Sequence, residues 1–94
     1  MAIIYDSKGV KKKVVLQTYY NLDGDYTLFD DNPLHNTTYE NVKVVITKEI
    51  IHLTHWDISV NVIRIDGQEP IECELVGYVE DGDTLIIKLC QDWG

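Results

Sequence analysis

Residues 76–89 read VGYVEDGDTLIIKL, in which one Asp-Gly pair separates two runs rich in β-branched and aliphatic side chains. An Asp-Gly step supplies the positive φ that a tight hairpin turn requires. The same pair recurs at Asp23-Gly24 and Asp66-Gly67, each time between similar runs. Three such turns predict an all-β fold, a small antiparallel barrel or sandwich of roughly six to eight strands with little or no helix.

Length and composition indicate a single folded domain spanning residues 1–94. Hydrophobic residues make up 45% of the chain, which favours a globule over a disordered chain. No apolar run approaches the roughly 18–20 residues of a membrane-spanning helix. The N-terminus has no basic lead-in of the kind that begins a signal peptide. We therefore expect a cytoplasmic protein in which Cys73 and Cys90 are reduced.

The charge of the chain is acidic and unevenly distributed. The formal net charge is −8, although Lys11, Lys12 and Lys13 make the N-terminal segment basic. An acidic surface repels phosphate backbones and anionic lipids, so direct binding to nucleic acid or to a membrane is disfavoured. Such a surface suits a basic protein partner, although the need for solubility explains it equally well.

Alternating apolar and polar residues locate the expected strands. These cover residues 2–5, 10–20, 26–29 and 42–46, with a turn at residues 47–49. Residues 30–41 contain little periodicity and are expected to form the one long loop, a functional or mobile segment. Residues 50–65 are too many for a typical strand, so we expect a bend or bulge around His55-Trp56-Asp57.

The second Asp-Gly turn predicts which face of the preceding strand is buried. Ile58, Val60 and Val62 alternate with polar residues and are therefore expected to face the core. A two-residue loop at the Asp66-Gly67 pair then places Val62 opposite Ile71, so that two apolar faces meet.

The third Asp-Gly turn bears on the cysteines. A three-residue loop with Gly82 in the left-handed conformation places Cys73 opposite Leu89 in the core and Cys90 on the other face, which predicts a buried thiol at Cys73. A two-residue loop would place the cysteines opposite each other, so a disulfide is the alternative. Apolar residues on the outer face would need a second layer, a closed barrel end or a partner subunit: Val76, Tyr78 and Ile86.

Metal and catalytic motifs are weak. His52 and His55 with Asp57 have the donor chemistry of a zinc site, but strand residues three apart point to opposite faces, so they converge only across a bulge or turn. Aspartates beside the glycines are explained by turn propensity rather than calcium. A phosphate-binding glycine loop, GxSxG and HExxH are all absent from the sequence. We expect no catalytic residue, no metal and no cofactor.

Aromatic residues beside acidic ones give the best candidate for a binding surface, because Tyr and Trp are favoured interface anchors. The predicted partner-binding residues are Tyr19, Tyr20, Asp25, Tyr26, Asp30, Asp31, His35 and Trp56. The alternative is that most of these rings complete a small core.

Two function hypotheses follow. In the first, the chain is a small acidic non-enzymatic β-domain that binds a basic protein partner, as an inhibitor, an immunity-type protein or a phage-encoded antagonist. In the second, it is a small-ligand-binding β-barrel, or a homo-oligomer such as a homodimer, with aromatic-lined pockets. Salt dependence separates them, because charge-steered association weakens as ionic strength rises.

Overall fold

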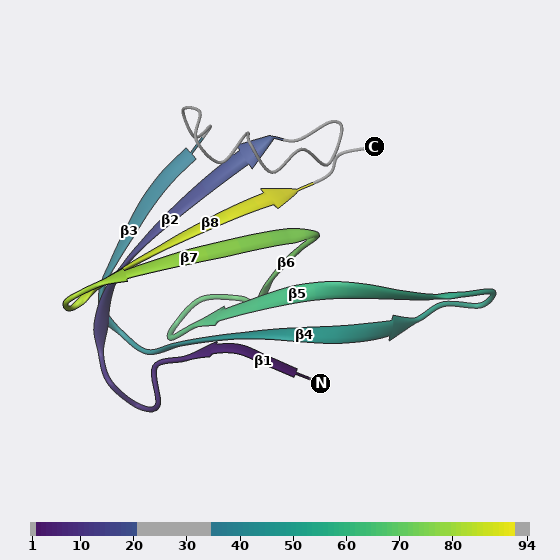
Figure 1. Cartoon of the computed structure of the whole chain (residues 1–94), viewed down its shortest axis with the longest axis horizontal. Helices are drawn as coiled ribbons and strands as arrows, with labels where there is room; N and C mark the ends of the chain where they lie inside the picture. The colour runs from purple at the N-terminus through teal and green to yellow at the C-terminus, as the bar shows by residue number, and fades with distance from the viewer. Residues whose placement is uncertain (1, 21–34, 92–94) are drawn as a thin grey trace.

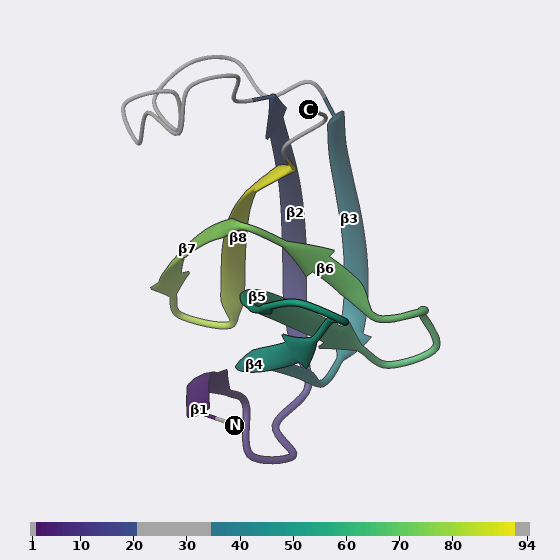
Figure 2. The ribbon, with the colours of Figure 1, turned by 90° about the vertical axis from the view of Figure 1, so that its right-hand side faces the viewer.

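The computed structural model describes residues 2–20 and 35–91, with Tyr20 and Gln91 described by their backbone alone. The described residues form eight strands and no helix, so the all-β prediction is confirmed. The strands lie in two four-stranded sheets that face each other in a sandwich, as Figures 1 and 2 show, and not in a closed barrel. No helix in the described residues is long and apolar enough to cross a membrane.

Each sheet mixes strands from different parts of the chain. In spatial order, the first sheet contains β1 (Ala2–Asp6), β4 (Val44–His52), β5 (Asp57–Ile65) and β6 (Ile71–Cys73). The second sheet contains β3 (His35–Val42), β2 (Lys12–Tyr20), β8 (Thr84–Gln91) and β7 (Leu75–Asp81). We call them the β4–β5 sheet and the β2–β8 sheet.

A parallel pair forms the centre of the β2–β8 sheet. Val14 of β2 lies beside Leu85 of β8, and all other pairs of neighbouring strands in the molecule's described part are antiparallel. A parallel pair needs a long crossover connection. Here the chain between β2 and β8 forms β3 and β7 of the same sheet and β4, β5 and β6 of the other sheet. The expectation of antiparallel pairing alone is therefore wrong at this position.

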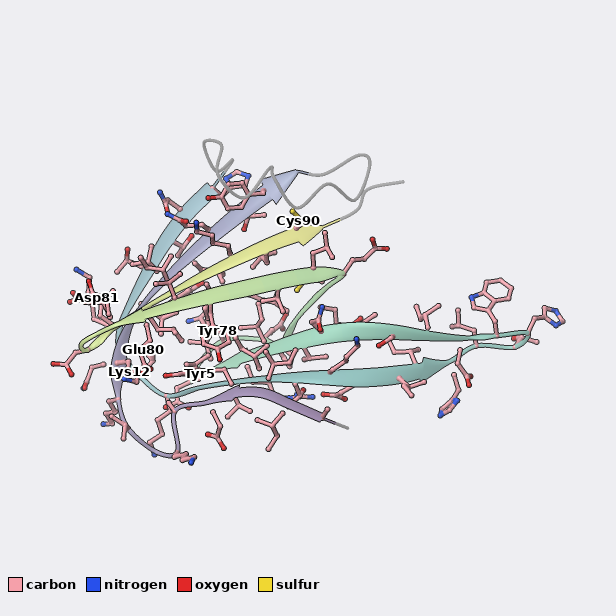
Figure 3. All side chains as sticks on the ribbon, viewed as in Figure 1. Tyr5, Lys12, Tyr78, Glu80, Asp81 and Cys90 are labelled. Carbon is pink, nitrogen blue, oxygen red and sulfur yellow. The ribbon has the colours of Figure 1, made fainter. Side chains whose placement is uncertain are left out.

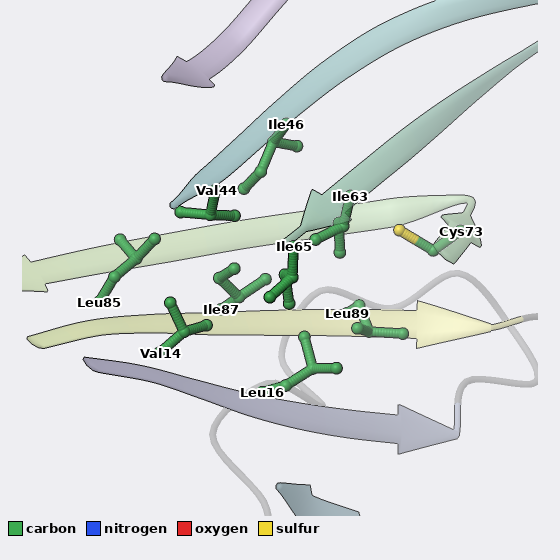
Figure 4. Close-up of a cluster of buried hydrophobic side chains, with 10 residues drawn as sticks. All are labelled: Val14, Leu16, Val44, Ile46, Ile63, Ile65, Cys73, Leu85, Ile87 and Leu89. Carbon is green, nitrogen blue, oxygen red and sulfur yellow. The ribbon is translucent and has the colours of Figure 1, made fainter. Parts of the chain in front are cut away.

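The core lies between the two sheets, as the close-up in Figure 4 shows. Its buried side chains come from five strands: Val14, Leu16, Val44, Ile46, Ile63, Ile65, Cys73, Leu85, Ile87 and Leu89. Burying one such aliphatic side chain contributes about 1.5–3 kcal/mol relative to leaving it in water. The facing layers therefore hold the sandwich together mainly by apolar contact.

The turn predicted at residues 47–49 is wrong. β4 runs through these residues, and the chain reverses instead at residues 53–56, where the Leu53 N–H donates to the Trp56 carbonyl over 2.8 Å. The bend expected around His55-Trp56-Asp57 is thus in the right place, but it is a complete hairpin turn. Thr47 remains inside the strand because its hydroxyl donates to Glu49 and accepts from Arg64.

The predicted buried face of β5 is wrong in part. Ile63 enters the core between the sheets, and the residues expected there lie on the opposite face: Ile58, Val60 and Val62. Val62 is nevertheless buried, at 5% exposed, whereas Ile58 is exposed. Gly67 has the expected positive φ of 76°, but residues 66–70 separate β5 from β6, so Val62 pairs with Glu72. A slip of one residue in strand register exchanges the two faces, and this accounts for the error.

At the third Asp-Gly pair the loop contains two residues, Gly82 and Asp83, rather than three. Gly82 has a φ of 59° at the first loop position, where type II′ turns carry glycine. Cys73 does not pair with Leu89, because it belongs to β6 of the other sheet and pairs with Asn61. Cys73 is nevertheless buried in the same core cluster as Leu89, and Cys73 and Cys90 do not form a disulfide.

The long loop expected over residues 30–41 is wrong where the structure describes it, because residues 35–41 belong to β3 and pair with β2. Thr and Tyr in this stretch suit a pleated strand, although the polar sequence hides the apolar alternation. The expected strand at residues 26–29 and the turn at Asp23-Gly24 lie outside the described residues.

Candidate functional site

The hairpin of β4 and β5 projects beyond the rest of the sandwich, toward the right of Figure 1. β1 pairs with β4 only as far as Lys48, and β6 pairs with β5 only over residues 61–63. Past those positions, β4 and β5 pair with no other described strand. We call residues 49–60 the arm.

Exposed apolar side chains gather on the arm. Eight large hydrophobic side chains are exposed among the described residues, and four of them lie on the arm: Ile50, Leu53, Trp56 and Ile58. Ile50 is 62% exposed and Trp56 is 60% exposed. Single exposed hydrophobic residues are common, but a group of them on one projecting element is typical of an interaction surface.

Apolar side chains stand on both faces of the arm, although the face of Ile50 also carries Ser59, His52 and Asp57. Ile51 lies directly opposite Ile58 in the register, and Ile50 points to the other face because side chains alternate along a strand. A two-stranded hairpin is only marginally stable on its own in water, so an apolar partner surface would stabilise the arm.

Charged side chains on the arm and at its base are paired. His52 Nδ1 lies 2.8 Å from Asp57 Oδ1 near the hairpin turn, where both side chains are exposed. At the base, Arg64 Nη1 donates to Glu49 Oε2 over 2.8 Å. The hydrogen bond from Arg64 holds the pKa of the Glu49 carboxyl below its ordinary value. The stacked rings of His55 and Trp56 extend the apolar surface at the tip.

An acidic segment begins at the end of β5 that is away from the arm and returns along β6 to the base of the arm. Residues 66–74 contain no Lys or Arg, and their four carboxylates are all exposed: Asp66, Glu69, Glu72 and Glu74. Glu72 pairs with Val62 and therefore lies on the same face as Ile58. The Asn61 side chain donates to the Glu74 carbonyl over 2.8 Å, which fixes this segment against β5. The apolar arm thus rises beside a negative patch.

A second cluster, labelled in Figure 3, lies at one end of the sandwich. The Tyr5 hydroxyl donates to Glu80, and Lys12 Nζ lies 3.2 Å from the same carboxylate. Burial, followed by the contact with Glu80, raises the pKa of Tyr5 to about 12. The Tyr5 ring packs against Tyr78 with centroids 5.0 Å apart. Because these residues join strands of both sheets, we assign the cluster a structural role.

An open hollow of about 570 Å³ lies beside Arg64. Its lining comes from β4, β5 and the turn after β5: Lys43, Val44, Val45, Thr47, Arg64, Ile65, Asp66 and Gly67. None of these residues is aromatic. Arg64 already contacts Glu49, and the Asp66 carboxylate accepts from the Lys43 N–H over 3.2 Å. This hollow therefore does not provide the aromatic-lined pocket of the second hypothesis.

The predicted binding residues do not form one described surface. Trp56 is exposed on the arm, and His35 is exposed at the start of β3 in the other sheet. Tyr19 is only 5% exposed, which does not support its inclusion in a binding surface. The other predicted residues, or their side chains, lie outside the described part: Tyr20, Asp25, Tyr26, Asp30 and Asp31.

Sequence reasoning missed the apolar residues of the arm. Ile50, Ile51 and Leu53 stand almost side by side in the sequence, without the alternation of a half-buried strand. Adjacent isoleucines must point to opposite faces of a strand, so apolar residues on both faces were the available signal.

The described residues contain no group of three or more His, Cys, Asp or Glu side chains that could hold a metal ion. Comparisons of the chain with models of protein families, with curated proteins and with solved structures found no match.

Proposed function

We propose that the protein is a small, acidic, non-enzymatic β-domain that binds a basic protein partner through the arm. The observation that carries the proposal is the concentration of exposed apolar side chains on residues 49–60, beside the acidic segment 66–74. An inhibitor, an immunity-type protein or another antagonist that occupies a basic groove is the type of protein we expect.

Apolar contact would supply most of the affinity. Trp56, Leu53 and Ile58 would enter the groove, and burial of each such side chain is worth about 1.5–3 kcal/mol before the costs of association. Trp side chains are also enriched among residues that dominate binding energy. The pairing of Glu49 with Arg64 limits the number of unpaired charges that would be carried into the interface.

Charge would act mainly on the rate of association. The net charge of −8 and the patch around Glu72 and Glu74 would attract a basic surface over distances longer than a contact. Asp30 and Asp31 add to this charge, and their part in steering remains a prediction from sequence. Raising the salt concentration should therefore slow association more than it speeds dissociation.

The chain offers a well-matched pair of variants for testing this function. Ile50 on the arm and Ile3 on β1 are both isoleucines and are both 62% exposed. After the partner has been identified by cross-linking in the native host, its binding kinetics are measured with Ile50→Ala, Trp56→Ala and Ile3→Ala. We expect faster dissociation for the two arm variants and wild-type kinetics for Ile3→Ala.

A charge variant completes the test. Replacing Glu72 and Glu74 together by glutamine should slow association at low salt and leave dissociation nearly unchanged. If the partner binds all of these variants as tightly and as fast as the wild type, the arm is not the binding surface.

A further inference from the structure

The edge of the β2–β8 sheet is a second feature of the surface, separate from the arm. β3 is the terminal strand of this sheet, paired with β2 on one side and with no described strand on the other. It is eight residues long and reads HNTTYENV. Natural edge strands are usually short or carry Lys, Pro or inward-pointing charges that prevent pairing with another chain. β3 contains no Lys or Pro, and its only formal charge at pH 7 is Glu40.

The regular part of β3 is long enough to receive another strand. Its pairing with β2 is continuous from Tyr39 back to His35, and the irregularity lies nearer the other end, where Asn41 has a φ of 59°. In an antiparallel sheet, alternate residues direct their N–H and C=O groups to opposite sides. Every second residue of β3 therefore presents backbone hydrogen-bonding groups on the side away from β2, where no described strand pairs with it.

We propose that β3 pairs antiparallel with β3 of a second copy of this chain, around a two-fold axis at Thr38. The product is a homodimer with one continuous eight-stranded sheet, built from the four-stranded β2–β8 sheet of each copy. Such an interface is isologous, as in most soluble dimers. The proposal concerns a surface that the proposed function does not use.

The register around Thr38 follows from the geometry of a two-fold axis perpendicular to the sheet. The axis keeps each side chain on its own face, so paired residues must both have even numbers or both have odd numbers. With Thr38 on the axis, Thr37 meets Tyr39 of the other copy, and Asn36 meets Glu40. A β-branched residue beside an aromatic one, and an amide donor beside a carboxylate, are favourable cross-strand pairs.

Charge favours a second copy over a basic partner at this edge. Glu40 gives the edge little negative charge, and Lys12 lies beside Val42 at the end of β3. The acidic segment 66–74 belongs to the other side of the fold, in the turn after β5 and in β6. Repulsion between two chains of −8 is thus not concentrated at the contact, and salt screens it over about 8 Å at physiological ionic strength.

The dimer would leave both arms accessible. The arm belongs to the β4–β5 sheet, and Figure 1 shows it projecting away from β3. Two arms in one particle could engage two grooves of an oligomeric partner, and linked binding sites raise the apparent affinity without any new contact.

The test is a charge exchange at Thr38, which is exposed on the face of β3 away from the core. Sedimentation velocity is measured for the wild type, for Thr38→Lys alone, for Thr38→Glu alone and for an equimolar mixture of the two variants. We expect a dimer for the wild type, loss of the dimer for each variant alone, and a dimer again in the mixture. Like charges at the axis repel, whereas opposite charges attract.

Two controls separate this interface from the arm. Thr54→Lys places the same charge on an exposed threonine of the arm turn and should leave the dimer intact, and so should Ile50→Ala. Circular dichroism confirms that each variant is folded. A wild type that stays monomeric over its whole soluble concentration range overturns the proposal, as does a dimer that survives both Thr38 variants or is lost in Ile50→Ala. None of these results depends on whether the arm binds a basic partner.

Discussion

Tyr5 of β1 donates a hydrogen bond to Glu80 of β7, and this contact ties an edge strand of one sheet to an edge strand of the other. Lys12 of β2 approaches the same carboxylate, so the Glu80 side chain of β7 receives contacts from two other strands. The two sheets are otherwise held together mainly by apolar contact. Such contact favours burial of the facing side chains but does not by itself fix how the edges of the two sheets are aligned. The Tyr5–Glu80 contact therefore helps to fix the sheets in one relative position.

The first prediction concerns stability at alkaline pH. The fold raises the pKa of Tyr5 from 10.0 to about 12, so it favours the neutral phenol. The resulting stabilisation is complete below pH 10 and is lost as the pH rises through about 12. Denaturant unfolding at several pH values should show this loss in the wild type and a shallower loss in Tyr5→Phe. Tyr78→Phe, which keeps Tyr5 and Glu80, is the control and should follow the wild type.

The second prediction concerns acid. Hydrogen bonds from Tyr5 and Lys12 lower the pKa of Glu80, and a hydrogen bond from Arg64 lowers that of Glu49. The stabilisation from these carboxylates is present above their ordinary pKa of 4.5 and is lost as the pH falls through the lowered values. Glutamine at either position should make the acid limb of a stability–pH curve shallower. An unchanged curve for Glu80→Gln would contradict the contact.

The third prediction concerns the buried thiol. Burial raises the pKa of Cys73 to about 12, with a smaller contribution from Cys90, so the reactive thiolate is scarce at neutral pH. In a Cys90→Ala background, Cys73 should react with a thiol reagent only after unfolding. Cys73→Ser should lower the unfolding free energy by about 1–3 kcal/mol more than Cys73→Ala does, because it buries a hydroxyl among apolar side chains. Equal stability of the two variants would place Cys73 outside the core.

The fourth prediction separates the core from the arm. Ile63 of β5 is fully buried, whereas Ile50 of the neighbouring β4 is exposed. Ile63→Ala should lower the unfolding free energy by about 2–5 kcal/mol, because it removes transfer energy and leaves a cavity. Ile50→Ala should change it by no more than about 0.5 kcal/mol. Urea denaturation measures both, and similar losses would mean that Ile50 is packed in the fold rather than exposed on the arm.

The fifth prediction uses Gly67, whose φ is 76° in the turn between β5 and β6. A Cβ atom at this position would have no atom within 4 Å, so the effect of a substitution is conformational rather than steric crowding by neighbours. Gly67→Ala should destabilise the fold by roughly 1–2 kcal/mol, the usual cost of left-handed backbone for an L-residue. Gly67→Asn should cost less, because asparagine tolerates this conformation. Thermal unfolding of the two variants compares them directly.

Sequence reasoning was most successful where the signal is local. The positive φ at Gly67 and Gly82 follows from glycine chemistry at a turn, and the strands on either side follow from β-branched composition. Burial of Cys73 was also predicted correctly, although the register used to predict it was wrong. A small apolar residue in a strand beside a core is often buried in more than one register.

Features that depend on distant contacts could not be predicted. Thr47 and Glu49 have the polar character of turn residues, but they lie inside β4. Arg64 of the neighbouring strand donates a hydrogen bond to each of their side chains. The faces of β5 depend on whether the following loop has two residues or five, and a single Asp-Gly step does not distinguish these lengths. The arm could not be predicted, because it is defined by the positions at which β1 and β6 stop pairing with β4 and β5.

The parallel pairing of β2 with β8 has a consequence for synthesis of the protein on the ribosome. β2 is made before its neighbour β8, which leaves the ribosome only after β3, β4, β5, β6 and β7 have been made. Until then, Val14 and Leu16 lack the strand that lies beside them in the sheet, and the part of the core that Leu85, Ile87 and Leu89 supply cannot form. Contacts between such distant residues form slowly, and a nascent apolar strand with one open side is prone to aggregate. A chaperone that shields nascent chains should therefore increase the yield of this protein more than that of a helical protein of similar size.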